Sequence, residues 1–99
     1  MTDHLLALIA AHFACSDMAT VRHLTIGEVE YCGAVYHEIK LNFVPDMDPS
    51  RFAALDPEEK VRVNKEGFMA FYAWRLANPD LVAHLEDVAR GKTTLAISG

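Results

Sequence analysis

Two carboxylates and an imidazole lie close together in the chain, at Glu28, Glu30 and His37. These residue types can bind a divalent cation, and a carboxylate that orients an imidazole can act as an acid–base pair. If the segment folds as a β-hairpin, Glu28 lies opposite His37 near the turn, with His12 of the preceding segment nearby. A partly solvated ion pair at the end of a hairpin explains the same residues without a function. Glu28, Glu30 and His37 are therefore the candidate metal ligands.

The segment GFMAFYAWRLA, residues 67–77, concentrates aromatic side chains on a predicted helix. At 100° per residue its apolar side chains fall on two sides of that helix. One interpretation is a central helix buried on both sides. The other is a docking surface centred on Trp74, with Arg75 and Tyr72 beside it, because Trp, Tyr and Arg are frequent interface anchors. Gly67 is expected to allow another backbone to come close.

An acidic segment precedes this helix. Residues 46–59 hold one arginine against five acids, a net charge of −4. Such a segment can complement a basic surface, and the resulting attraction weakens with added salt. With Trp74, Arg75 and Tyr72, the predicted partner-binding residues are therefore Asp46, Asp48, Glu58 and Glu59.

The elements that must position these residues are predicted from hydrophobic periodicity. A helix is expected over about residues 3–15, with its large side chains facing the core. Residues 21–44 alternate apolar and polar side chains, which predicts an antiparallel β-hairpin turning at Cys32 and Gly33. The tail TTLAIS could add a third, C-terminal edge strand. The predicted fold class is therefore α+β, with two to three C-terminal helices packed on one face of the hairpin.

Three helix starts share one pattern, a polar capping residue followed by proline. Asp48-Pro49 opens a short helical turn through Leu55, and Asp56-Pro57 opens a long helix to Ala77. Asn78-Pro79 opens a last helix, and Gly91 ends it. Residues 46–91 are therefore predicted to be largely helical.

Composition limits the class of protein. Ninety-nine residues with 52% hydrophobic and 23% charged side chains fit a single small domain, residues 1–99, with a core of its own. The net charge of −5 opposes direct binding to nucleic acid or to an anionic membrane. Cys15 and Cys32 match no metal-binding spacing and are expected to be reduced core residues. The first residues lack the basic start of a signal peptide, so a cytoplasmic location is predicted.

No nucleophile motif and no cofactor motif stands out, so the sequence favours a binding protein over an enzyme, and no cofactor is expected. The leading hypothesis is a small acidic protein that binds and blocks or adapts a macromolecular partner, most simply a protein with a basic surface. Inhibitors, immunity proteins and adaptors, including those encoded by phages and mobile elements, are of this size. One alternative is a small-ligand or metal-binding domain or enzyme that uses Glu28 and His37. Another is a homo-oligomeric structural subunit, of which a homodimer is the simplest form.

Overall fold

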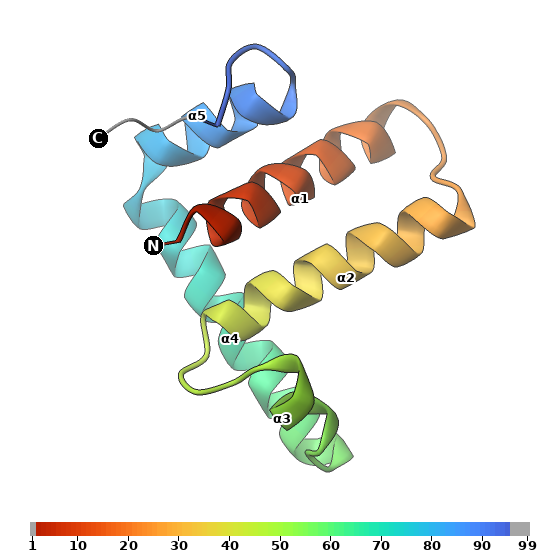
Figure 1. Ribbon diagram of the computed structural model, residues 1–99, viewed down its shortest axis with the longest axis vertical. Helices are drawn as coiled ribbons and strands as arrows, with labels where there is room; N and C mark the ends of the chain where they lie inside the picture. Colours follow the sequence, from red (N-terminus) through yellow and green to blue (C-terminus); the bar gives the residue numbers. More distant parts are fainter. Residues whose placement is uncertain (1, 96–99) are drawn as a thin grey trace.

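The computed structural model describes residues 2–95, and in this range the chain forms helices and no strand (Figure 1). The predicted α+β fold class is therefore wrong, and the domain is all-helical. The helices are α1 (Asp3–Val21), α2 (Ile26–Asn42), α3 (Pro49–Ala53), α4 (Pro57–Ala77) and α5 (Pro79–Ala89).

The helices α1 and α2 form an antiparallel hairpin, and the other helices are arranged around it (Figure 1). The helix α4 packs across the C-terminal end of α2, and α5 returns to lie along α1. The short α3 lies beside the N-terminal half of α4. One end of α4 therefore extends well beyond the α1–α2 hairpin.

Two apolar clusters hold this arrangement together. In the larger one, Ile9 of α1, Ile39 of α2 and Leu85 of α5 are fully buried, and Phe71 of α4 is 2% exposed. The smaller cluster lies where the chain leaves α2. It consists of Leu41, Val44 and Val63, with Met47, Phe52 and Leu55 packed against them. Both clusters join α2 to α4, so these helices are fixed relative to each other.

The predicted β-hairpin is replaced by the single helix α2. Its start carries a capping box: the Thr25 hydroxyl accepts a hydrogen bond from the Glu28 backbone N–H, and the Glu28 carboxylate accepts one from the Thr25 N–H. Val35 and Ile39, four residues apart, are buried on one face of the helix. Residues spaced by four satisfy both the strand and the helix periods, which is why the alternation was misleading. Gly33 lies in the helix interior and not in a turn.

Some of the other predicted helix boundaries are confirmed, and others are wrong. The starts of α3 and α4 are confirmed, because the carboxylates of Asp48 and Asp56 accept hydrogen bonds from backbone N–H groups three residues later, at 2.8 and 2.9 Å. The end of α4 at Ala77 and the left-handed Gly91 after α5 (φ 75°) are also as predicted. The helix α1 continues to Val21, past the predicted end at residue 15. Residues 93–95 form no strand, and residues 96–98 of the predicted edge strand lie outside the described residues.

The predicted close approach at Gly67 is confirmed. Gly67 is buried, and a Cβ atom at this position would overlap the backbone carbonyl of Lys40 in α2, with the carbonyl carbon only 2.9 Å away. Because Lys40 is in the last turn of α2, the main chains of α2 and α4 meet at this point. Only glycine permits that contact without moving one of the helices.

We expect the substitution Gly67→Ala to lower the free energy of unfolding by about 1–3 kcal/mol, the usual cost of overpacking a close contact. Gly33→Ala is the matched control, because a Cβ at Gly33 meets nothing within 4 Å. That control should raise stability by about 0.5–1 kcal/mol, since alanine is favoured over glycine inside a helix. Urea unfolding of both variants measures the difference. Equal effects of the two substitutions would contradict the close contact.

Candidate functional site

The two sides of α4 have different environments. Val63, Gly67 and Phe71 are buried against α2 and the core. The opposite side is exposed, although it is also apolar, and its large side chains are 48–69% exposed. We call this set the outer stripe: Val61, Phe68, Met69, Tyr72 and Leu76.

From Phe68 to Leu76 the outer stripe is continuous along the helix. Phe68, Tyr72 and Leu76 follow one another at intervals of four residues, so they lie one above the other on one face. The rings of Phe68 and Tyr72 stack, with their centroids 6.2 Å apart and their planes at 23°. Arg62 and Lys65 are exposed between Val61 and this aromatic pair. A contiguous exposed apolar surface of this kind is typical of an interaction site.

Of the three residues predicted at the centre of the docking surface, Tyr72 alone belongs to the outer stripe. Trp74 is half-buried, and its ring lies 6.1 Å from that of Phe71 and 6.0 Å from that of Phe43. Arg75 is also half-buried, with its guanidinium carbon 5.0 Å from the centre of the Phe13 ring. The structure therefore turns Trp74 and Arg75 toward the inner side of α4. The helical period alone did not indicate which of the two apolar sides faces the core.

The four predicted acidic residues are all exposed, and they lie between α2 and the first turn of α4. Asp46 adopts the left-handed backbone conformation (φ 55°), and Asp48 caps α3. Both contribute to a shallow hollow of about 480 Å³ at the bend after α2. Glu58 and Glu59 occupy the first turn of α4, where the helix dipole favours negative charge. The acidic segment therefore adjoins the N-terminal end of the outer stripe.

The structure does not bring the candidate metal ligands together. Glu28 and Glu30 lie in the first turns of α2, whereas His37 is more than two turns further along and packs edge-on against Phe52, with ring centroids 4.6 Å apart. Burial lowers the pKa of His37 below its usual value, and the charge of Lys40 adds to the shift. Within residues 2–95, no three His, Cys, Asp or Glu side chains are grouped as metal ligands would be. The proposed pairing of Glu28 with His37 depended on the hairpin and has no counterpart in α2.

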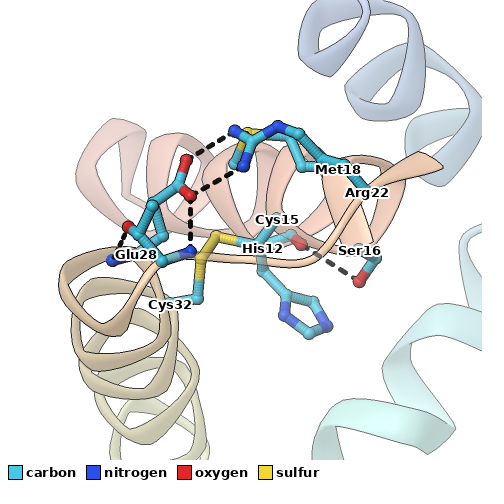
Figure 2. Close-up of a disulfide and its surroundings, with 8 residues drawn as sticks. His12, Cys15, Ser16, Met18, Arg22, Glu28 and Cys32 are labelled. Atoms are coloured by element: carbon cyan, nitrogen blue, oxygen red, sulfur yellow. Dashed lines mark hydrogen bonds and ion pairs between the residues drawn. A yellow bond between two sulfur atoms is a disulfide. The ribbon is translucent and has the colours of Figure 1, made fainter. Parts of the chain in front are cut away.

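The cysteines form a disulfide, so the expectation that both are reduced is wrong. Cys15 of α1 and Cys32 of α2 have their Cα atoms 5.9 Å apart and are bonded through sulfur (Figure 2). The bond links the two antiparallel helices within the part of the hairpin nearest the connecting loop. Because the pair belongs to two separate helices, local spacing in the sequence gave no sign of it.

An ion pair closes the same end of the hairpin. The guanidinium of Arg22, after α1, donates hydrogen bonds of 2.8 and 2.6 Å to both carboxylate oxygens of Glu28 (Figure 2). The hydrogen bonds from Arg22, followed by the bond from the Thr25 backbone N–H, lower the pKa of Glu28 to about 2. Glu28 therefore has a structural role here, joining the α1–α2 loop to the start of α2.

We expect the double substitution of Cys15 and Cys32 by alanine to lower the free energy of unfolding by about 3 kcal/mol, because a disulfide across a loop of this length restricts the unfolded chain by that amount. The bond spans a sequence separation of 17. Denaturant unfolding with and without a reductant measures the effect. The reductant should destabilise the native protein and leave the double variant unchanged. Insensitivity of the native protein would contradict the bond.

The ion pair predicts a pH dependence. The pKa of Glu28 is lowered from 4.5 to about 2 in the folded protein. The pair therefore stabilises the fold fully above pH 4.5, and this contribution is lost as the pH falls from 4.5 through about 2. Carboxyl NMR titration should give a Glu28 midpoint near pH 2, which Arg22→Gln should raise.

The control is Arg90→Gln, which removes an arginine that pairs with Asp17 and Glu86 instead. It should leave the Glu28 midpoint where it was. If the midpoint of the Glu28 titration is the same in Arg22→Gln as in the native protein, the pair does not form in solution.

Comparisons with protein-family models, with curated proteins and with solved structures found no match for the chain. By length and composition the apolar helix α1 could span a membrane, a property that core helices of soluble proteins and signal sequences share. Residues 3–21 of this helix contact α2 and α5 in the fold.

Proposed function

We propose that the protein binds a macromolecular partner, and blocks or adapts it, by docking through the outer stripe of α4. The observation that carries the proposal is the exposure of Val61, Phe68, Met69, Tyr72 and Leu76 on one helix face. Of these, Phe68 and Tyr72 form a stacked pair at the middle of the stripe. Aromatic side chains at the centre of an apolar surface are the usual anchors of a protein interface.

The exposure of five large apolar side chains on one helix is consistent with this role. Exposed apolar surfaces of several hundred Å² are at the upper limit for a monomer and commonly mark interaction sites. Removing such a surface from water is favourable by roughly 25 cal/mol per Å² before the costs of association. The stripe lies on a long helix whose other side is fixed by the core, so little ordering is needed on binding. A groove or an apolar helix face on the partner would fit it.

Charge indicates what kind of partner this is. The chain carries a net charge of −5, and residues 46–59 concentrate acids next to the stripe. Glu58 lies one turn before Val61, so a partner that covers the stripe also meets this acidic end. A second copy of the chain would bring like net charges together. A protein whose apolar site has basic residues on the side that meets this acidic end is therefore the better complement.

Two features of the chain favour different compartments. The sequence predicts a cytoplasmic location, whereas the Cys15–Cys32 bond favours an oxidising environment, because disulfides are rare in reducing compartments. Docking through α4 is compatible with either location, since the disulfide joins α1 to α2 and is not part of the stripe.

We expect Tyr72→Ala to weaken partner binding by about tenfold or more, the effect of removing an interface anchor. Tyr31→Ala is the matched control. Tyr31 is 58% exposed on α2 and Tyr72 is 54% exposed on α4. Each substitution therefore removes a tyrosine of similar exposure, but from a different helix. A photo-crosslinking residue at position 72 identifies the partner, and titration calorimetry then measures its affinity for each variant.

Further arms of the experiment separate the possible outcomes. Loss of affinity in Tyr72→Ala but not in Tyr31→Ala supports the proposal, as does weakening by salt and by Glu58→Gln. Equal affinities of both variants would overturn it. A crosslinked product of twice the chain mass would identify the occupant as a second copy and overturn the choice of a basic protein partner.

A further inference from the structure

The inner side of α4 meets a cluster of polar aromatic groups that the docking proposal does not use. His12 of α1 stacks on Tyr36 of α2, with centroids 4.7 Å apart and planes at 7°. The His12 ring also lies 5.8 Å from Phe71 of α4. Figure 2 shows this ring turned away from the disulfide, toward the side on which α4 lies. Three helices thus bring His12, Tyr36 and the inner side of α4 together.

Arg75 completes the cluster from α4. Its guanidinium carbon lies 5.0 Å from the centre of the Phe13 ring and 5.8 Å from that of Phe71. A guanidinium that stacks on aromatic rings by its face keeps its N–H groups free at the edge, in the plane that pairs with carboxylates and phosphates. Arg75 is half-buried against these rings, so part of its hydration is removed.

Within residues 2–95, Arg75 has no carboxylate partner. The ion pairs of this part of the chain involve Arg22, Arg90 and His4. This is notable in a chain with 14 acidic residues and 9 lysines and arginines. Lys40 adds a second positive charge, with its Nζ atom 4.7 Å from the centre of the Tyr36 ring. The cluster therefore combines positive charge and hydrogen-bond donors without a neighbouring anion.

The pKa values report the same imbalance. Burial lowers the pKa of His12, and the positive charge of Arg75 lowers it further. Burial raises the pKa of Tyr36, and the charge of Arg75 opposes this shift. The positive charge of Arg75 is therefore felt at both rings.

We propose that Arg75, His12 and Tyr36 form a binding site for a small oxyanion, a carboxylate or a phosphate, at the junction of α1, α2 and α4. Arg75 supplies the paired N–H donors, and the imidazole N–H and the phenol hydroxyl supply single donors. Lys40, with its Nζ atom 4.7 Å from the centre of the Tyr36 ring, adds a second positive charge. The site lies on the inner side of α4 and is separate from the outer stripe, so it does not depend on the docking proposal.

The test uses sodium phosphate and sodium acetate as probes, each added to the full chain up to about 20 mM, the range in which millimolar binding is detected. Ionic strength is held constant with chloride. NMR should show saturable shifts of the His12 and Tyr36 ring signals with one probe or both, and the stronger probe assigns the ligand as phosphate or carboxylate. Arg75→Gln should weaken this binding by about tenfold.

Arg62→Gln is the control, because it removes an exposed arginine from the outer side of the same helix. It should leave the affinity unchanged. Arg75→Lys is a second variant in case Arg75→Gln does not fold, because it keeps the charge and the aliphatic stem over the rings. It loses the paired N–H donors of the guanidinium, so it should bind the probe with intermediate affinity. The absence of saturable shifts with both probes, or equal weakening by Arg62→Gln and Arg75→Gln, would overturn the site.

Discussion

The contact between Gly67 and the carbonyl of Lys40 sets the orientation of α4. Because Gly67 has no side chain, the backbone of α4 rests directly on the last turn of α2. That contact fixes the rotation of α4 about its own axis, so Val63 and Phe71 enter the core while Phe68 and Tyr72 face water. Rotating α4 by about half a turn would exchange these groups, because both sides of the helix are apolar. The exposure of the outer stripe is thus a consequence of one missing side chain.

The same orientation gives α4 two separate chemistries. Its outer side exposes apolar and aromatic side chains that cover no part of the core. Its inner side places Arg75 over Phe13 and Phe71. The α1–α2 hairpin is the platform for both. Its loop end is held by the Cys15–Cys32 bond and by the Arg22–Glu28 pair, which keep His12 and Tyr36 in register on facing helices.

The sequence predicted the second half of the chain better than the first. Local signals with a direct physical cause were reliable: Asp48 and Asp56 before proline begin α3 and α4, Gly91 ends α5, and Gly67 allows a close approach. The helix α2 was missed because its alternating side chains suit a strand as well as a helix. The capping box of Thr25 and Glu28 was the local signal that could have decided between them.

The candidate site was predicted in part. The aromatic segment and its second apolar side were evident in the sequence. Deciding whether Trp74 or Phe68 is the exposed centre required knowing which side of the helix meets α2, and the prediction of Trp74 was wrong. The disulfide and the cluster of His12, Tyr36 and Arg75 join residues from separate helices. Such contacts are set by the tertiary packing, and no local spacing encodes them.

The central claim, that the outer stripe is exposed in the free protein and covered by a partner, is tested most directly by solvent accessibility in solution. A soluble paramagnetic agent should broaden the NMR signals of Phe68, Met69 and Tyr72 in the free protein and spare those of Phe71. In the complex with the partner, the signals of the stripe should be protected as well. Protection of the stripe in the free monomer, or continued broadening in the complex, would contradict the account.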